Sequence, residues 1–493
     1  MQMGKQYILA IDRGQSKIKA ALYNSEAEVA FVNSEECQEI QARQPGWAEQ
    51  DMELMWQQTI CAIKGVLNKS GVNPKEIIAV SFSGQGGGNF MIDKEGKPAY
   101  PGVLSLDSRH EKVFCPNNLP RTLAFMYWLK KNEPEVYSKV RWIFGCKDYL
   151  RYCLTGKVNV DISDTPAPVN LEEKKYVIEG LDEAGISEVK EMLPEILYAS
   201  EICGSVTEQA AQETGLLEGT PVVVGAHDMI ACSLGAGGYR PGHLTIIMGT
   251  LGINIAVVNE KIKLKESASL GKFFMFGGAF KGVKTVTTSI GSACNTVNWV
   301  LDTMFIEEKK EAESLGISVF TLIERKLRGM EPTNVIFQPY LMGTFYNSAA
   351  KLGWTGIHMG TTREELLLSV FQGVCISMCI EIERLEKKVG RLDDVWLVGG
   401  GSESSIWRQM FADALGRPIH ICKTNEVGCR GAAVCAEIAL KGFAEDAHFW
   451  IPKEGGIYYP NPRRTAIYKE QIQIYKKVYD MAVSVWEQQK SYK

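Results

Sequence analysis

The sequence of 493 residues contains no CxxC pair and only six histidines, so it lacks the spacings typical of metal and redox sites. Its thirteen cysteines are scattered. The two that lie nearest in sequence, Cys375 and Cys379, are one helical turn apart within an apolar stretch. We therefore interpret the cysteines as small buried residues of a reduced, cytoplasmic protein.

The chain also lacks a basic excess. Lys and Arg number 54 against 58 Asp and Glu, which leaves a net charge of −4 and predicts no nucleic-acid partner. The apolar stretch at the N-terminus is too short for a signal peptide. No window approaches the roughly 20 apolar residues of a membrane helix, so we expect no membrane partner.

The common nucleotide-binding motifs are missing as well, since neither GxGxxG in Rossmann context nor GxxxxGK[ST] occurs. With 45% hydrophobic and 23% charged residues, the composition is that of a globular protein. The length predicts two domains of roughly 200–250 residues each. We place their boundary beside the glycine-rich segment 235–242, which gives domains of residues 1–243 and 244–493.

A strand, a tight glycine turn and a second strand occur twice in the chain, at Tyr7–Leu22 and at Thr245–Val258. This pattern predicts two β-hairpins. Small residues at a hairpin tip let backbone N–H groups approach an anion, and a hydroxyl adds a further donor. One such hairpin in each half of the chain indicates two phosphate loops and hence phosphoryl transfer.

Asp12 ends the first of these strands at the glycine turn. A carboxylate there is able to hold Mg²⁺, directly or through water, beside transferring phosphates. The alternative is a turn aspartate that caps its own backbone. The amide of Gln15, the hydroxyl of Ser16 and the charge of Lys19 favour the phosphate and metal interpretation.

Asp228 follows the apolar strand 222–226, in a predicted loop close to the suspected cleft. Phosphorylation of an alcohol requires a carboxylate that orients the hydroxyl and accepts its proton. The neighbouring His227 competes for this role, although a lone histidine is more often structural. The sequence therefore favours Asp228 as the catalytic base.

Two further glycine clusters stand out. Gly399 to Gly401 follow a predicted strand and open a helix, which permits a nucleobase or ribose to lie against the backbone, or serves only as a packing turn. Gly84 to Gly88 form either a flexible loop or open space beside a polyol. Gln85 favours contact with the substrate, because it ends the strand next in order to the one that delivers Asp107.

Together these motifs resemble the FGGY carbohydrate kinases of the sugar kinase/actin/heat-shock ATPase superfamily. The resemblance extends from Ile8 to about Phe443. The segments that carry it are residues 12–16, 225–228 and 248–250, residues 44–51, which are similar to the family's proline-glycine-tryptophan segment, and residues 399–416 with 426–433, which look like its adenosine region.

The resemblance implies an α/β fold of two RNase-H-like (actin/hexokinase-type ATPase) domains with an interdomain active-site cleft. It implies transfer of the γ-phosphate of ATP to a hydroxyl of a sugar or polyol, with Asp228 as base and Asp12 on the Mg²⁺ side. The implied phosphate contacts are Gly14, Gln15, Ser16, Lys19, Gly249 and Thr250. The implied nucleotide contacts are Asn298, Gly400, Gly401 and Ser404, and the implied acceptor contacts are Gln85, Gly86, Gly87, Asp107 and Asp228.

Two departures from the family pattern bear on the substrate. Gln15 stands where most members have threonine, and Gly86-Gly87 replaces the bulkier Met-His or Arg-Glu pairs of the D-xylulose and glycerol kinases. Residues 84–88 and 106–109 look most similar to the L-xylulose kinase branch. We therefore expect a ketopentose such as L-xylulose, or a polyol, in space left by the two glycines. The alternatives are an actin-like nucleotide-binding sensor without phosphotransfer and a kinase of a non-sugar alcohol; a homodimer is left open.

Overall fold

The computed structural model describes residues 5–112, 119–263, 273–344, 347–424, 426–443 and 451–490. The chain forms two compact units that are discontinuous in sequence. The first consists of residues 1–237, 276–284 and 426–451, and the second of residues 238–275, 285–425 and 452–493. The boundary between residues 243 and 244 stays a prediction about the functional domains.

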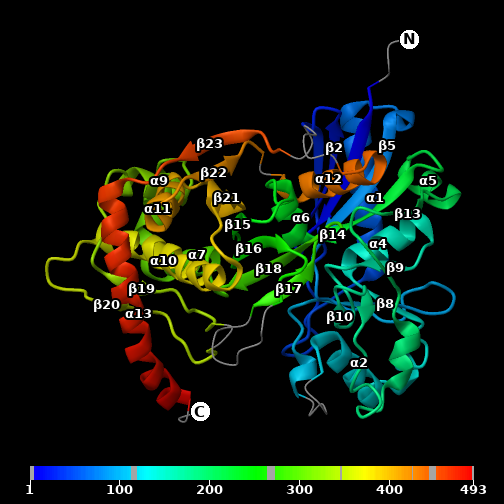
Figure 1. The fold of residues 1–493 in the computed structure, drawn as a ribbon, viewed down its shortest axis with the longest axis horizontal. Coiled ribbons are helices and arrows are strands. Elements are labelled where there is room, and N and C mark those ends of the chain that lie inside the picture. The colour runs from blue at the N-terminus through cyan, green and yellow to red at the C-terminus, as the bar shows by residue number, and fades with distance from the viewer. Residues whose placement is uncertain are drawn as a thin grey trace. The chain divides into compact units, whose positions relative to one another are not determined.

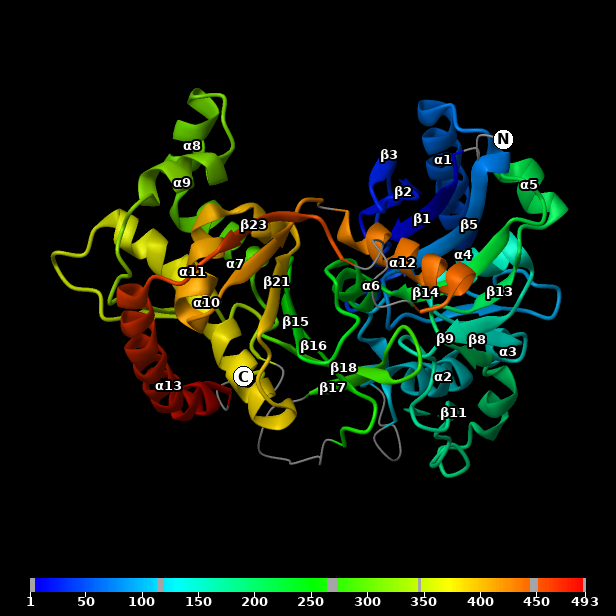
Figure 2. The same cartoon turned by 45° about the horizontal axis from the view of Figure 1, so that its top comes forward.

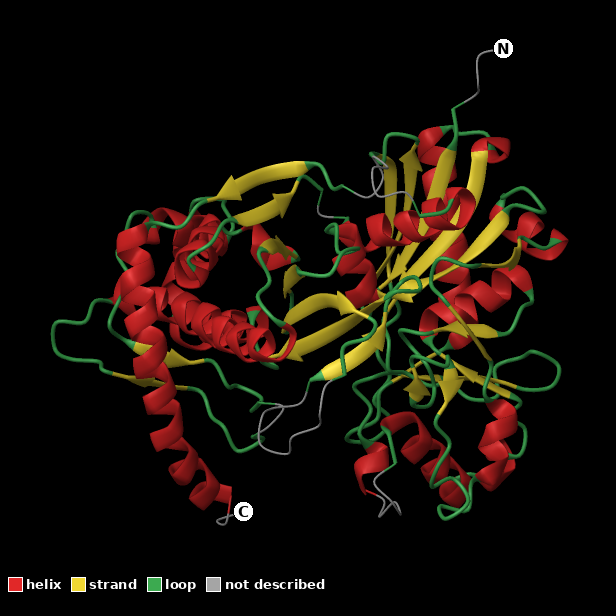
Figure 3. Ribbon diagram, viewed as in Figure 1, coloured by secondary structure: helices red, strands yellow, loops and turns green. Residues whose placement is uncertain are grey.

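The first unit contains a six-stranded sheet whose strands appear in yellow in Figure 3. Its order is β13 (Ile202–Ser205), β14 (Pro221–His227), β5 (Ile77–Gly84), β1 (Tyr7–Arg13), β2 (Lys17–Asn24) and β3 (Val29–Glu36). β1, β5 and β14 are parallel, whereas β2 and β3 continue from β1 as an antiparallel meander. The first predicted hairpin is thus confirmed.

The second sheet contains seven strands. Its order is β17 (Phe274–Gly277), β18 (Val283–Ser289), β16 (Gly252–Asn259), β15 (His243–Met248), β21 (Asp394–Val398), β22 (Ile419–Cys422) and β23 (Glu454–Tyr458). β15 and β16 form the second predicted hairpin, and β21 and β22 run parallel to β15. Each sheet therefore places an antiparallel hairpin beside two further parallel strands, and the predicted α/β class is confirmed.

Helices and short strands complete both units (Figure 1). In the first unit the helices are α1 (Met52–Ser70), α2 (Arg121–Asn132), α3 (Pro134–Tyr137), α4 (Cys146–Thr155), α5 (Glu208–Thr214), α6 (Asp228–Gly235) and α12 (Val427–Lys441). In the second unit they are α7 (Cys294–Met304), α8 (Ile306–Ser314), α9 (Val319–Leu327), α10 (Arg363–Val389), α11 (Ser405–Leu415) and α13 (Pro462–Lys490). The short strands are β4 (Glu49–Gln50), β6 (Phe90–Ile92), β7 (Gly102–Val103), β8 (Trp142–Phe144), β9 (Asn159–Asp161), β10 (Val169–Asn170), β11 (Lys175–Tyr176), β12 (Glu195–Leu197), β19 (Ile336–Gln338) and β20 (Gly353–Thr355).

Helix α12 comes from the C-terminal half of the sequence but packs in the first unit, against α6, β1, β5 and β14 (Figure 2). Two glycines permit the close approach of α12 and α6. A Cβ on Gly431 would lie 1.9 Å from the carbonyl oxygen of Ala231, and a Cβ on Gly235 would lie 2.0 Å from that of Val427. Residues 427–433, which resemble part of the adenosine region of the family, thus pack in the first unit, and their contact with the nucleotide stays a prediction.

Helix α10 is long and apolar enough to cross a membrane by length and composition, contrary to the expectation that no window comes close. Of its apolar window, 83% is buried, and the residues concerned belong to the hydrophobic core of the second unit. Burial of this kind is typical of a core helix. The helix starts at a capping box, in which Thr362 and Glu365 bind each other's backbone N–H.

Candidate active site

The candidate site begins where three neighbouring parallel strands of the first sheet end together. In the register of β1 and β5, Asp12 lies opposite the residue before Gly84, and Gly84 lies opposite the last residue of β14. Gln85 and Asp228 are the next residues after these two strands. Ligands of open α/β sheets bind at the carboxyl ends of the strands, and three predicted site residues lie there.

Asp12 is a half-buried carboxylate that is held in place from two sides. Its Oδ1 accepts a hydrogen bond of 2.8 Å from the hydroxyl of Ser83 on β5. On the other side, the N-terminal turn of α12 comes so near that a Cβ on Gly428 would lie 2.5 Å from Oδ2. A glycine is required at position 428 because any side chain there would displace the carboxylate.

Negative charge accumulates around Asp12. Burial raises the pKa of Asp12 to about 6, and the carboxylates of Asp228 and Glu426 add to this effect. The hydrogen bond from Ser83 and the charge of Lys19 act in the opposite direction. A carboxylate that is destabilised by its neighbours in this way is well suited to a cation.

The raised pKa predicts how Asp12→Asn changes stability. The folded-state pKa of about 6 exceeds the ordinary value of 3.8, so Asp12 stabilises the fold when protonated, and this contribution is lost as pH rises through 6. Asn stays neutral and still accepts from Ser83. We expect the Tm of Asp12→Asn without Mg²⁺ to exceed that of the wild type at pH 7.5 and to match it near pH 4. Asp393→Asn serves as control, because the side chain of Asp393 is 69% exposed. A Tm difference between Asp12→Asn and the wild type that does not change with pH would contradict the raised pKa of Asp12.

The first hairpin tip follows Asp12 directly. The N–H of Gly14 donates to the carbonyl of Lys17 at 2.9 Å and closes the turn. The side chains of Gln15 and Ser16 project from this turn without a hydrogen bond to the described residues. Lys19, which we predicted as a phosphate contact, forms an ion pair of 2.8 Å with Glu426.

Asp228 is the first residue of helix α6 rather than part of a loop, contrary to the sequence interpretation. Its Oδ1 accepts from the N–H of Met229 at 2.6 Å and lies 3.1 Å from Nε2 of His227. Its Oδ2 forms no hydrogen bond or ion pair within the described part of the chain. The side chain is 38% exposed, so Oδ2 is available to a ligand.

The space beside Gly86 is filled by protein. A Cβ at this position would lie 2.5 Å from both Cδ2 and Nε2 of His227, and 3.0 Å from Oδ1 of Asp164. The sequence interpretation left this space to the acceptor, whereas the imidazole of His227 occupies it. Gly87 differs, because a Cβ there would meet only Ser105, at 3.6 Å, within 4 Å.

The other two residues predicted on the acceptor side are buried. Gln85 places its side-chain nitrogen 3.9 Å from the sulfur of Cys146, and its Oε1 has no hydrogen-bond partner in the part of the chain that the structure describes. Asp107 accepts from Arg109 at 2.6 Å and from the backbone N–H of Ala48 at 2.8 Å. Arg109 in turn lies 3.6 Å above the ring of Trp47, so Asp107 supports the proline-glycine-tryptophan segment.

Sequence reasoning missed Asp164, in the loop after β9. Its Oδ1 accepts from the N–H of Gly87 at 3.0 Å, while its Oδ2 is buried and finds no hydrogen-bond partner among the described residues. Burial raises the pKa of Asp164 to about 6, although the charges of His227 and Lys147 act against it. Nothing in the local sequence distinguishes this aspartate from a turn residue, because its neighbours come from remote segments.

A cavity of about 510 Å³ lies in the second unit. Its lining includes six of the residues that were predicted for nucleotide and phosphate: Gly249, Thr250, Asn298, Gly400, Gly401 and Ser404. The lining also includes the apolar side chains of Phe320, Ile323, Phe371 and Trp407. Apolar and aromatic side chains together with a few polar groups are typical of small-molecule pockets.

The second hairpin tip forms one end of this cavity. Gly249 and Thr250 accept backbone hydrogen bonds from Cys294 at 3.2 Å and Ala293 at 3.3 Å, at the start of α7. The same helix carries Asn298, so the phosphate loop and a predicted nucleotide contact lie on connected elements. The tip itself is closed by the N–H of Gly249, which donates to Leu251 at 3.2 Å.

Comparison with known proteins places both halves of the chain in one family. Residues 7–118 and 116–235 match the N-terminal domain of the FGGY family of carbohydrate kinases, and residues 244–440 match its C-terminal domain. A "Probable L-xylulose kinase" of Pasteurella multocida is 29% identical over 495 residues, which covers 96% of this chain and 98% of the relative. An "L-xylulose/3-keto-L-gulonate kinase" of Escherichia coli is 30% identical over 453 residues and covers 88% of both chains.

The fold is similar to solved structures over nearly the whole chain. A protein from Brucella ovis described as a "xyloylose kinase" superposes with a TM-score of 0.84 at 25% identity, over 97% of this chain and 100% of that one. The match includes both units, so the two-domain sugar-kinase fold is common to the two proteins.

Proposed function

Because the chain belongs to the FGGY family of carbohydrate kinases, and so transfers phosphate from ATP to an alcohol group of a sugar, we propose that its acceptor is a ketopentose, with L-xylulose first among the candidates. Relatives that carry L-xylulose in their names cover most of this chain. Gly87 supports the proposal, since it brings no bulky or charged side chain to the acceptor.

The chemical step depends on Asp228. Its free Oδ2 accepts the proton of the acceptor hydroxyl while the hydroxyl oxygen forms a bond to the γ-phosphorus. The bond from that phosphorus to the β,γ-bridging oxygen breaks, and ADP leaves with the electron pair. The single observation that carries this assignment is the asymmetry of the carboxylate, with Oδ1 bound by two donors and Oδ2 unbound.

We assign ATP to the cavity of the second unit. The apolar wall with Phe371 and Trp407 would contact the base, and Asn298, Gly400, Gly401 and Ser404 would contact the nucleoside. The tip of the second hairpin, at one end of this cavity, would bind phosphate through backbone N–H groups, and the tip of the first hairpin offers the same kind of donors within its own unit. In the first tip, the side chains of Gln15 and Ser16 add donors, and Lys19 contributes charge nearby.

Mg²⁺ fits the residues around Asp12. Carboxylate oxygen is the ligand that Mg²⁺ prefers, and the negative charge near Asp12 is not balanced by Lys19 alone. The described residues contain no group of three or more His, Cys, Asp or Glu that could hold a metal, so phosphate oxygens and water would complete the coordination. When bound, the ion neutralises charge that develops on the β- and γ-phosphates.

We place the acceptor beside Gly87, where open space remains next to Ser105. The turn at Gly87 is held by Asp164 through the hydrogen bond to its N–H. Asp107 would act indirectly, because it binds the guanidinium of Arg109 that lies over the ring of Trp47.

The proposed acceptor is tested by coupled measurement of ADP release over a panel of sugars and alcohols. The panel contains L-xylulose, D-xylulose, D-ribulose, L-ribulose, 3-keto-L-gulonate, xylitol and glycerol. We expect the highest kcat/KM with a ketopentose. Release of ADP only with a non-sugar alcohol would refute the proposed acceptor without affecting the assignment of the kinase family.

The nucleotide site predicts opposite effects for two neighbouring glycines. A Cβ on Gly400 meets nothing within 4 Å and so enters the cavity, whereas a Cβ on Gly401 would lie 2.8 Å from Cβ of Met248 and 2.9 Å from the ring of Trp407. Gly400→Ala is expected to raise the KM for ATP by about 5- to 100-fold at unchanged Tm, because the added methyl excludes ligand. Gly401→Ala is expected to lower the Tm.

The control for both variants is Gly353→Ala on β20, where a Cβ also meets nothing within 4 Å and which does not line the cavity. Kinetics with ATP as varied substrate and thermal unfolding separate the outcomes. An unchanged KM for ATP in Gly400→Ala would place the nucleotide elsewhere.

The cellular compartment and the oligomeric state of the protein are proposed as well. We infer a cytoplasmic enzyme, with the cysteines in the described part of the chain present as free thiols. A homodimer is the assembly to test, by light scattering of the full chain.

A further inference from the structure

We propose that His227 is a positioning residue of the phosphotransfer site: its imidazole holds Oδ1 of Asp228, and Gly86 has no side chain because the imidazole occupies that space. The inference rests on the proposed role of Asp228 as base. It assigns to His227 a function in aiming the carboxylate, in place of proton transfer.

The first argument is the way in which the carboxylate is bound. Both contacts of Asp228 reach the same oxygen, since Nε2 of His227 lies 3.1 Å and the N–H of Met229 2.6 Å from Oδ1. The backbone donor is fixed by the start of α6, whereas the imidazole approaches from the preceding residue. With Oδ1 held by two donors, rotation about χ2 is restricted and Oδ2 keeps one direction, toward the acceptor.

The second argument is the close contact between Gly86 and the ring. A Cβ on Gly86 would lie 2.5 Å from Cδ2 and 2.5 Å from Nε2. These atoms belong to the edge of the imidazole that faces Asp228. The backbone of Gly86 is not in the left-handed region, so glycine is required here for space alone. Glycine at position 86 therefore leaves room for the edge of the His227 ring whose Nε2 binds Asp228.

The third argument is charge. Burial lowers the pKa of His227, but the carboxylates of Asp228, Asp164 and Asp161 outweigh it and raise the pKa to about 9. The imidazole is then a cation at neutral pH, and Nε2 carries a proton to donate to Oδ1. Oδ1 of Asp164 lies near the same hypothetical Cβ of Gly86 as the ring, and the charge of Asp164 stabilises the cation.

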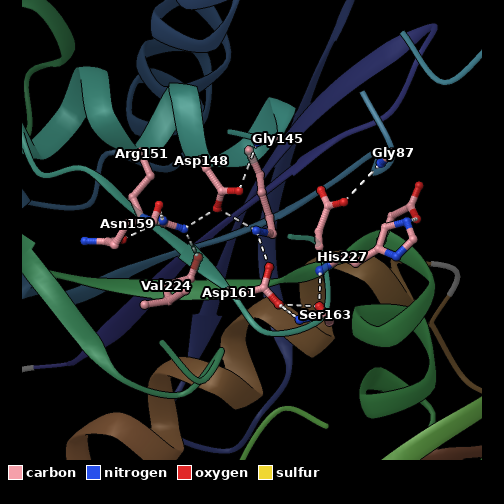
Figure 4. A network of polar contacts seen from close by, with 12 residues as sticks. Gly87, Gly145, Asp148, Arg151, Asn159, Asp161, Ser163, Val224 and His227 are labelled. Carbon is pink, nitrogen blue, oxygen red and sulfur yellow. Dashed lines mark hydrogen bonds and ion pairs between the residues drawn. The ribbon is translucent and has the colours of Figure 1, made fainter. Parts of the chain in front are cut away.

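The fourth argument is the anchoring of the His227 backbone (Figure 4). The N–H of His227 donates to Oγ of Ser163 at 3.1 Å, and Ser163 is bound to the buried carboxylate of Asp161. Asp161 pairs with Lys147, which also contacts Asp148 at 2.6 Å. These charged side chains are fully buried, so the backbone of His227 is fixed by a network that solvent does not reach.

The test is a double-mutant cycle of Gly86→Ala and His227→Ala, with His227→Gln as the conservative variant. His227→Ala is expected to lower kcat about 10- to 100-fold with little change in the KM for ATP, because the base is no longer aimed. Gly86→Ala is expected to lower kcat to a similar extent, because its methyl displaces the ring. The double variant should be no worse than His227→Ala, since the methyl then fits.

His227→Gln separates positioning from proton transfer. The amide of Gln donates to Oδ1 but does not accept a proton, so we expect most of the activity to return. Gly353→Ala controls for the glycine substitution, and thermal unfolding reports whether each variant folds. If Gly86→Ala does not fold, the comparison of His227→Ala with His227→Gln still decides the role of the imidazole.

Three results would overturn the proposal. A kcat of His227→Ala within twofold of the wild type removes the positioning role. A double variant whose loss is the product of the single losses separates Gly86 from His227. If His227→Gln is as inactive as His227→Ala while Asp228→Asn stays active, His227 is itself the base, and the proposed function of Asp228 fails as well. If Asp228→Asn loses activity while His227→Ala is as active as the wild type, the positioning role of His227 fails and the proposed role of Asp228 as base stands.

Discussion

Asp228→Asn is expected to lower kcat by roughly 10²–10⁴-fold, the usual contribution of a positioned acid–base group, with little change in ATP binding. Asn has the same shape as Asp. Its Oδ1 still accepts from Met229 and from His227, so the side chain keeps its orientation. Only the oxygen that receives the proton is replaced, by an amide nitrogen without a free electron pair for it.

The measurement is ADP release at saturating ATP and acceptor, together with the Kd for ATP from calorimetry. Asp393→Asn in the second unit is the matched control, because it removes an exposed carboxylate that belongs to neither the predicted site nor the lining of the cavity. Turnover close to that of the wild type in a folded Asp228→Asn protein would exclude Asp228 as base. His227 would then be the next candidate, since its ring lies beside the same space.

Asp12→Asn is expected to lower kcat by roughly 10²–10³-fold, in the range found when one preorganised electrostatic group is removed. The Mg²⁺ concentration for half-maximal activity should rise in the same variant. Both effects are expected because Asp12 lies beside the first phosphate loop and its carboxylate forms no ion pair with the described residues.

A titration of activity with Mg²⁺ at fixed ATP measures both quantities. If the rate and the titration are unchanged, Asp12 is a turn carboxylate whose task is the hydrogen bond to Ser83. The variant should also be more stable than the wild type at pH 7.5 without metal. A protein that is more stable but less active would identify Asp12 as a residue retained for function at a cost to the fold.

Much of the architecture could be predicted from local sequence. Apolar, β-branched segments joined by small residues predicted both hairpins, and both form. The residues predicted around the nucleotide line one cavity, and Gly400, Gly401 and Ser404 among them lie between a strand and a helix that the sequence marks clearly.

Other features of the site could not be predicted from the sequence. The sequence interpretation treated Gly86 as open space, and the structure fills this space with an imidazole from β14. It grouped residues 426–433 with the adenosine region, and the structure places Gly428 against Asp12. Asp164 gave no signal at all. Each of these depends on which remote segments meet, and spacing within one segment carries no information on that.

The sequence by itself therefore determined the two glycine hairpins, the class of fold and the position of Asp228 directly after a buried strand, because periodicity and turn chemistry act over a few neighbouring residues. Only the tertiary structure decided what surrounds these groups. The registers of β1, β5 and β14 bring Asp12, Gln85 and Asp228 to one edge of the first sheet, and helix α12 packs against these three strands. Burial, charge and hydrogen-bond partners follow from that packing, and these decide which oxygen of Asp228 is free to act.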